Sequence, residues 1–261
     1  MDKKQLKILT VGNSFGVDTS HHLPEVARSL GFENVKICVL YIGGCSLNRH
    51  YKNAEGDLPG YTYYVNESGA WETVEGKRIS EAVAEDDWDY IAIQHGTGDG
   101  SRYTLPESYQ KLEALIEYIK SLAPQKTRIA FNMAWVMASD SSHPEMRSYG
   151  GDQLTMYSNL ARLTEGVVKG ARGLDLVSPA GTAVQNARTT ELTDAQLMRD
   201  GFHLSYGLGR YMASLTFIKA LTGIDIDGVS WSPDGVDGQS KAIAIAAANA
   251  AVAEPFGITK I

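Results

Sequence analysis

The stretch LKILTVGNSFG, residues 6–16, decides how the rest of the chain is interpreted. Its first six residues are mostly apolar and predict a short buried strand that ends at Gly12. A tight turn follows, in which Ser14 lies close between two glycines. A serine held at a strand-to-helix turn can act as a nucleophile, because neighbouring backbone N–H groups can face a developing oxyanion. The alternatives are a turn in which Ser14 only caps a helix, or a phosphate-binding loop.

A second apolar run also ends at glycine. Residues 35–42 predict a strand that ends at Gly43 and Gly44. Between the two runs, residues 22–30 have a helical pattern, closed by Gly31 as a C-cap. This order predicts a βαβ unit with two parallel strands.

Three further strands are predicted at residues 90–94, 128–133 and 174–177. The helix before the fourth strand has one apolar face, made of Leu112, Leu115, Ile116, Ile119 and Leu122. The helix before the fifth strand runs through Leu160, Leu163, Val167 and Val168. Strands that are almost wholly apolar and alternate with helices are typical of a parallel sheet covered on both faces. We therefore expect an α/β fold, a three-layer α/β/α sandwich with a five-stranded parallel sheet.

The loops that follow these strands are expected to lie together. In open parallel sheets, ligands bind outside the carboxyl ends of the strands. This places the functional residues in the loops at 12–16, 43–46, 94–101 and 135–150.

Residues 51–77 interrupt the alternation of strands and helices. Within them, residues 61–65 and 71–74 flank a polar turn as the two strands of a hairpin would. We interpret this segment as a hairpin insertion beside the site. Helices are expected after the last strand at residues 194–198, 208–221 and 241–252. A chain of 261 residues is long enough for one large α/β domain, so we expect a single domain over 1–261.

Composition excludes several classes of partner. The chain has 24 Lys and Arg against 31 Asp and Glu, a formal charge of -7, so nucleic acid and anionic membranes are not expected partners. No signal peptide and no membrane-spanning apolar run are visible, which predicts a cytoplasmic protein, or an exported one if a leader has been removed. Cys38 and Cys45 are expected to be free thiols. The sequence does not predict the oligomeric state.

A serine nucleophile needs a base and a group that orients the base. The segment DGFH offers both, with Asp200 three residues before His203. Asp140 and His143 have the same spacing, in a stretch rich in Ser, Asp and Pro. We interpret this second pair as part of a solvated loop or of the rim of the site.

These segments resemble the blocks of the SGNH hydrolase superfamily, the GDSL-like esterases, and more narrowly its DUF4886-type branch. Residues 12–14 match the family's Gly-Asp-Ser block and residues 200–203 match its Asp-x-x-His block, in the same order. The resemblance implies the flavodoxin-like SGNH fold, with Ser14, Asp200 and His203 as the catalytic triad. It also implies an oxyanion hole formed by the N–H groups of Ser14 and Gly44, with Gly43 as an alternative to Gly44.

The third family block differs here. The family has Gly-x-Asn-Asp, whereas residues 96–99 of this chain are GTGD, which lacks the Asn that donates to the oxyanion. Loss of one such donor costs about 2.7–4 kcal/mol of transition-state stabilisation. We expect Gln94 to replace it in the oxyanion hole, with His95 behind it. The alternative is that both side chains only satisfy backbone groups at the sheet edge.

Aromatic and histidine residues near the site suggest substrate contacts. His95 and Trp135 are expected to bind substrate, Trp135 by stacking on a sugar or acyl group. Tyr63, Tyr64 and Trp71 of the insertion are further stacking candidates, although such residues often lie in the core. The remaining histidines form no metal-ligand pattern, so no metal and no cofactor are expected: His21, His22, His50 and His143.

The expected function is therefore a serine esterase that hydrolyses small acyl esters, and the family resemblance favours O-acetyl groups on carbohydrates. One alternative is a thioesterase or lysophospholipase of the same fold, which would need an apolar acyl tunnel. Another is a non-catalytic carbohydrate-binding protein on a decayed esterase scaffold.

Overall fold

The computed structural model describes the backbone of residues 5–96 and 105–261, and the side chains of 5–96 and 110–261. Residues 97–99 of the third family block, and residues 97–101 of the loop 94–101, lie outside the described residues.

Seven strands form one sheet in the order β4-β3-β2-β1-β5-β6-β7. Five of them are parallel: β1 (Gln5–Gly12), β2 (Asn34–Tyr41), β5 (Tyr90–Gln94), β6 (Arg128–Asn132) and β7 (Leu176–Ser178). Taken alone, the parallel strands have the spatial order 2-1-3-4-5 of flavodoxin-like folds. The predicted α/β class and parallel strands are confirmed.

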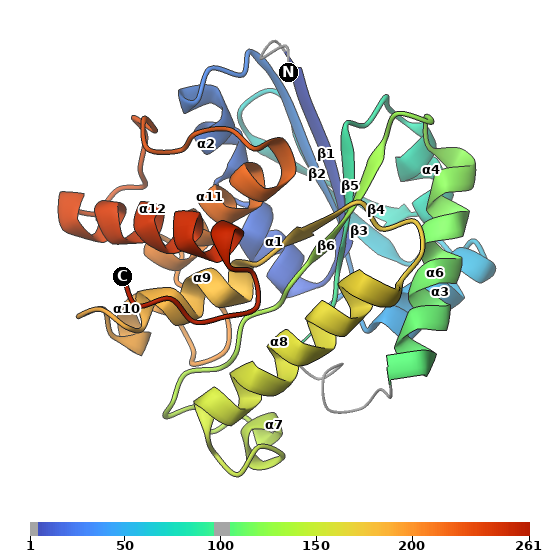
Figure 1. Ribbon diagram of the computed structural model, residues 1–261. Helices are drawn as coiled ribbons and strands as arrows, with labels where there is room; N and C mark the ends of the chain where they lie inside the picture. The colour runs from blue at the N-terminus through green and yellow to red at the C-terminus, as the bar shows by residue number, and fades with distance from the viewer. Residues whose placement is uncertain (1–4, 97–104) are drawn as a thin grey trace.

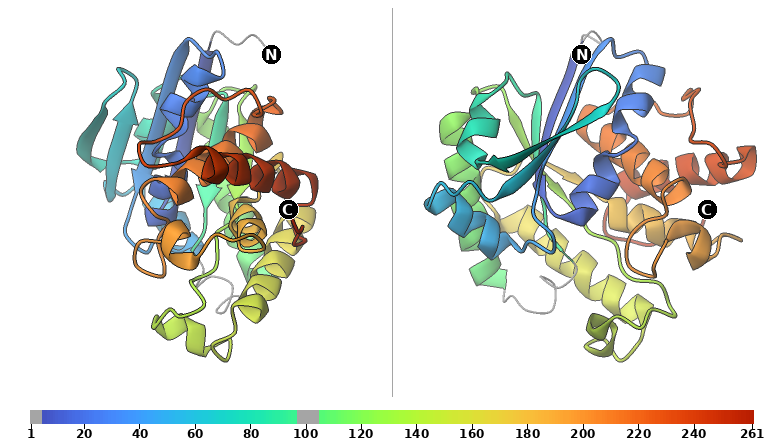
Figure 2. Two further views of the ribbon diagram at one scale, coloured as in Figure 1. Left: turned by 90° about the vertical axis from the view of Figure 1, so that its left-hand side faces the viewer. Right: turned by 180° about the vertical axis from the view of Figure 1, so that it is seen from behind.

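The hairpin changes the size of the sheet. Its strands, β3 (Tyr61–Asn66) and β4 (Trp71–Lys77), are antiparallel, and β3 pairs with β2 at the sheet edge. The prediction of a five-stranded sheet was therefore wrong, because the segment that was interpreted as an insertion beside the site belongs to the sheet itself. In Figure 2 this hairpin extends the sheet on the side away from β7.

Helices cover both faces of the sheet. One layer contains α1 (Ser14–Ser20), α2 (Leu23–Ser29), α9 (Ala180–Ala187), α11 (Leu208–Thr222) and α12 (Gly238–Ala253). The other contains α3 (Leu47–Glu55), α4 (Ile79–Ala84) and α6 (Leu105–Leu122). Figure 1 shows these layers on opposite sides of the strands, with α8 (Gln153–Gly170) below them. The short helices α7 (Pro144–Arg147) and α10 (Asp194–Leu197) lie in the loops after β6 and after α9.

The alternation of side chains along a strand divides the apolar residues between two cores. In β1, Leu6 and Ile8 pack with the first layer, whereas Leu9 and Val11 pack with the second. All four side chains are fully buried. The register then fixes where the functional edge lies, because Gly12 at the end of β1 pairs with Tyr41 at the end of β2. The loops after these two strands therefore leave the sheet at the same level.

Candidate active site

The turn after β1 presents Ser14 as the first residue of α1. Asn13 is the N-cap of this helix, and its side-chain oxygen accepts a hydrogen bond of 3.0 Å from the N–H of Phe15. The amide of Asn13 also donates to the carbonyl of Cys45, at 3.0 Å, which joins this turn to the loop after β2. Because Asn13 and not Ser14 caps the helix, the Ser14 hydroxyl is left for another partner.

The two glycines around this turn allow a close approach to the sheet. A Cβ on Gly12 would lie 2.8 Å from the Cβ of Gln94, and a Cβ on Gly16 would lie 3.0 Å from the methyl of Thr10. Separations this short are sterically unfavourable. Larger residues would move α1, and Ser14 with it, away from the sheet.

The loop before α11 brings an imidazole to the same place. Gly201 has a φ of +73°, a conformation that favours glycine, and it turns the chain back on itself. One carboxylate oxygen of Asp200 accepts from the N–H of Phe202 at 3.0 Å and from that of His203 at 2.6 Å. Its other oxygen lies 2.7 Å from Nδ1 of the His203 ring. The DGFH segment is therefore a compact turn in which Asp200 fixes the orientation of the imidazole.

The nucleophile and the base meet across 189 positions of the sequence. Nε2 of His203 lies 2.9 Å from Oγ of Ser14. Partial burial alone would raise the pKa of Asp200. The pKa is nevertheless held below its usual value, because Asp200 accepts hydrogen bonds from the backbone N–H and the ring of His203 and from the N–H of Phe202. An ionised Asp200 accepts from Nδ1–H, which leaves Nε2 free to accept the proton of Ser14. This arrangement can activate a serine hydroxyl.

Aromatic rings support the turn that carries His203. Phe15 stacks on Trp135 with ring centroids 4.3 Å apart and contacts Phe202 at 5.0 Å. The indole N–H of Trp135 donates to the carbonyl of Phe202 at 3.0 Å. On the outer side, the His143 ring stacks on Phe202 at 4.8 Å. The side chain of His143 also caps α7, a place at the rim in keeping with the structural interpretation of the Asp140–His143 pair.

The structure does not support the substrate-binding roles expected for Trp135 and His95. Trp135 is 0% exposed and donates to the carbonyl of Phe202, and His95 is 1% exposed and stacks on Phe131. Side chains this deeply buried present no surface to a substrate. The sequence showed that both residues follow a strand, but not that their side chains point into the protein.

The oxyanion role expected for Gln94 does not fit the structure either. The side chain of Gln94 is fully buried, and its amide donates to the carbonyls of His95, at 2.7 Å, and of Asn132, at 3.2 Å. Its oxygen accepts from the side-chain amide of Asn132. No amide hydrogen is left for an oxyanion, and the alternative, that Gln94 satisfies backbone groups at the sheet edge, describes what is observed.

The two backbone donors expected in the oxyanion hole lie in the turns after β1 and β2. Gly44 follows β2 with a φ of +59°, and a Cβ there would meet no atom within 4 Å, so the residue faces open space. Among the described residues, none accepts a hydrogen bond from the Gly44 N–H. The N–H of Ser14 lies in the first turn of α1, where helix N–H groups have no intrahelical partner. The hydrogen bond from Asn13 to Cys45 holds these two segments together.

Sequence reasoning missed a buried ionic network under the triad. Asp18, one turn along α1 from Ser14, is 0% exposed and forms ion pairs with Arg199 and Arg210, at 3.0 and 2.7 Å. It also accepts from the N–H of Leu204 at 3.1 Å. A signal was present in the sequence, since Asp18 is a charged residue in a helix that is otherwise short of charge and Arg199 directly precedes Asp200.

An apolar pocket of about 290 Å³ lies along α1. Its walls come from α1 and its C-cap, from β2, β3 and β4, and from the start of α11: Val17, His21, Val39, Tyr64, Trp71, Thr73 and Arg210. Val17 and His21 share a face of α1 with Ser14, because residues three and seven apart lie on one side of a helix. Two of the stacking candidates, Tyr64 and Trp71, thus line one pocket, whereas Tyr63 is 1% exposed and belongs to the core.

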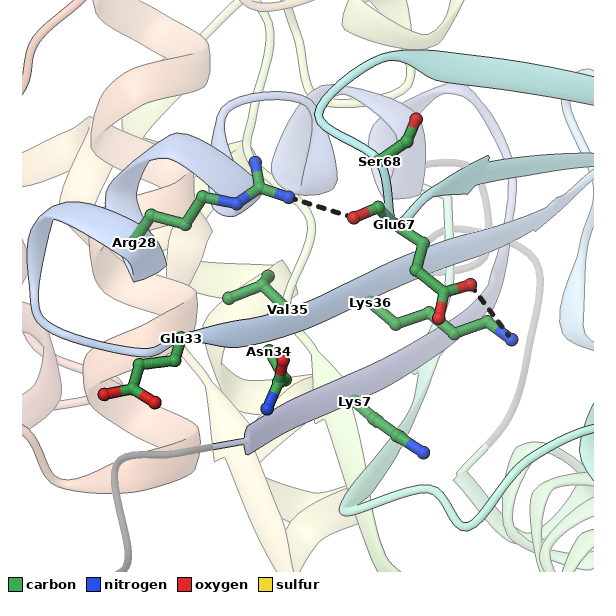
Figure 3. Close-up of a pocket in the computed structure, with 8 residues that line it drawn as sticks. All are labelled: Lys7, Arg28, Glu33, Asn34, Val35, Lys36, Glu67 and Ser68. Atoms are coloured by element: carbon green, nitrogen blue, oxygen red, sulfur yellow. Dashed lines mark hydrogen bonds and ion pairs between the residues drawn. The ribbon is translucent and has the colours of Figure 1, made fainter.

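A second pocket, of about 210 Å³, lies at the other end of the sheet and is shown in Figure 3. It contains three cationic side chains, but Arg28 donates to the carbonyl of Glu67, and Lys36 is paired with Glu85 and Asp86. Lys7 likewise contacts Asp86. Because each of these three side chains already has a partner, we assign no role to this pocket.

The described residues contain neither a metal site nor a membrane-spanning helix. Among the side chains of 5–96 and 110–261, no group of three or more His, Cys, Asp or Glu could hold a metal ion. In the same part of the chain, no helix has the length and apolar character needed to cross a bilayer.

Solved structures described as SGNH hydrolases or esterases share this fold. A proposed SGNH hydrolase from Slackia heliotrinireducens is 19% identical, with a TM-score of 0.56 over 84% of this chain and 100% of that one. A catalytic mutant of Axe2, an acetylxylan esterase from Geobacillus stearothermophilus, is 15% identical, with a TM-score of 0.56 over 83% and 94%. At these identities the likeness is one of fold.

The chain belongs to the DUF4886 family, whose model, described as "Domain of unknown function (DUF4886)", matches residues 7–251. A DUF4886 family protein from Bacteroides uniformis is 31% identical, with a TM-score of 0.92 over 99% of this chain and 98% of that one. No curated protein matches the chain.

Proposed function

We propose that this protein is a serine esterase that hydrolyses small acyl esters, with O-acetyl groups on carbohydrates as its substrate class. The observation that carries the proposal is the chain of contacts from Ser14 to His203, at 2.9 Å, and from His203 to Asp200, at 2.7 Å. The likeness in fold to an acetylxylan esterase supports the choice of substrate class.

In the proposed reaction, Oγ of Ser14 attacks the ester carbonyl while Nε2 of His203 takes its proton. Asp200 holds the ring and stabilises the imidazolium. The N–H groups of Ser14 and Gly44 receive the oxyanion. His203 then protonates the departing alcohol. In deacylation it takes a proton from the attacking water and returns it to Oγ of Ser14 as the carboxylic acid leaves. Apart from the ester and water, the proposed reaction uses only groups of the protein.

The test is hydrolysis of p-nitrophenyl acetate, together with acetate release from acetylated xylooligosaccharides. We expect turnover by the wild-type protein and a loss of at least about 10³-fold in kcat for Ser14→Ala, because removal of the nucleophile leaves only binding and the oxyanion donors. A fluorophosphonate probe should label the wild type and not the variant. Carbohydrate binding with neither turnover nor labelling would replace this proposal by the binding-protein alternative.

A second candidate, an esterase or thioesterase for longer acyl chains, is favoured by one observation. The pocket along α1 is large and mostly apolar, and it begins one helical turn from Ser14. An acetyl group would leave most of its 290 Å³ unfilled. The dependence of kcat/KM on acyl chain length separates the two candidates.

A further inference from the structure

A single buried carboxylate connects the two halves of the candidate triad. One oxygen of Asp18 lies 2.8 Å from Nε of Arg210 and 3.1 Å from Nη1 of Arg199. The other lies 3.0 Å from the same Arg199 nitrogen and 3.1 Å from the N–H of Leu204. Asp18 thus accepts from three residues, two of them cationic, which are 181 to 192 positions away in the sequence.

Two of these donors flank the acid–base turn. Arg199 directly precedes Asp200, and Leu204 directly follows His203. Arg199 also closes the turn on itself: its backbone N–H donates to the carbonyl of His203 at 3.1 Å, and its guanidinium donates to the carbonyl of Leu204. Asp18 therefore holds both ends of the turn that carries the imidazole.

The same carboxylate belongs to the helix that carries the nucleophile. Asp18 lies four residues after Ser14, about 6 Å along the axis and on the same face of α1. A rigid helix thus joins the Ser14 hydroxyl to the anchor of the His203 turn. A displacement of about 1 Å between reacting groups can cost roughly 10²-fold in rate, so such an anchor bears on proton transfer.

A buried ion cluster of this kind is better suited to fixing the positions of the groups it joins than to stabilising the fold. Burial of charges is costly, and replacement of a buried ion cluster by apolar side chains is often neutral or stabilising. Here one carboxylate faces two guanidinium groups, and the ring of Tyr206 lies 4.8 Å from Arg199 and 4.7 Å from Arg210. The N–H groups of a planar guanidinium point in fixed directions, so these contacts define direction as well as distance, which apolar packing does not.

We propose that Asp18 is a positioning residue that holds the imidazole of His203 within proton-transfer distance of Ser14. This inference rests on the proposed esterase function. It concerns a residue that touches neither substrate nor the reacting atoms, so its removal should affect the rate of reaction and not the binding of the ester.

The test compares Asp18→Asn with Asp86→Asn. The control residue Asp86 is also held by two cations, Lys7 and Lys36, but near the start of the strands, far from Ser14. For Asp18→Asn we expect kcat on p-nitrophenyl acetate to fall about 100-fold with KM unchanged, and fluorophosphonate labelling of Ser14 to slow equally. For Asp86→Asn we expect wild-type kcat, whatever its effect on Tm.

A second variant covers the case in which Asp18→Asn does not fold. Arg199→Met keeps the length of a side chain that is 21% exposed and removes one anchor of the turn, so kcat should fall at least 10-fold with KM unchanged. Wild-type kcat in a folded Asp18→Asn or Arg199→Met variant overturns the positioning role and leaves the esterase proposal intact. A wild type with no turnover and no labelling overturns the esterase proposal itself.

Discussion

At the scale of the residue, adjacent side chains in the turn after β1 have separate roles. Asn13 caps α1 and reaches the carbonyl of Cys45, so that the next residue, Ser14, is free to face His203. The sequence predicted that these segments would carry the site. It could not predict the direction of Gln94, because the pairing of its amide with Asn132 depends on the register between β5 and β6.

The role of Asp200 can be tested by Asp200→Asn, which keeps the shape of the side chain. An amide no longer requires the Nδ1–H tautomer of His203, so Nε2 is no longer held as the acceptor of the Ser14 proton. We expect kcat for p-nitrophenyl acetate to fall by about 10²–10⁴-fold with little change in KM. An unchanged kcat would show that another group orients the imidazole.

At the scale of the element, the hairpin was predicted as a hairpin but not as the edge of the sheet. Its strands have aromatic and β-branched residues around a polar turn, which are local signals. Its pairing with β2 is not local: an edge strand leaves unpaired N–H and C=O groups, and β3 satisfies those of β2. That pairing places Tyr64 and Trp71 beside α1 and so creates the apolar pocket.

The pocket can be tested by Thr73→Trp, which places a large side chain at an exposed position of its wall. If the pocket holds acyl chains, the variant should lose at least about 10-fold in kcat/KM on p-nitrophenyl octanoate and retain activity on the acetate, because burial of each CH₂ contributes about 0.8 kcal/mol. Val74→Trp is the matched control, since Val74 is the next residue of β4 and faces the opposite side. An equal effect of both variants, or of Thr73→Trp on both esters, would contradict acyl binding there.

At the scale of the whole molecule, the buried His50 and His95 and the half-buried His21 make the fold sensitive to acid. Burial, with a smaller contribution from Arg49, lowers the pKa of His50 to about 3, and burial lowers that of His95 to about 4 against the hydrogen bond to Gly96. For His21, burial is again the largest cause, followed by the charge of Arg210, and its pKa is lowered to about 4.

Because these pKa values are lower in the folded than in the unfolded protein, the unfolded state binds more protons below about pH 6.5. The contribution of these neutral histidines to the free energy of unfolding is therefore fully present above pH 6.5 and is lost progressively as pH falls toward 4. His95 alone contributes about 3 kcal/mol to this loss by pH 4. We expect Tm to fall steadily between pH 6.5 and 4, and His95→Phe to reduce the slope. A Tm that is constant over this range would contradict burial of neutral histidines.

The sequence by itself determined the α/β class, the parallel strands and the segments that bear Ser14, Asp200 and His203. These follow from local properties: apolar periodicity, glycine at turns, and motifs of a few residues. Tertiary structure alone decided that the hairpin completes the sheet, that Gln94, His95 and Trp135 point inward, and that Asp18 joins α1 to the His203 turn. The physical reason is that side-chain direction and long-range ion pairing depend on strand register and helix packing, and these are settled only when distant segments meet.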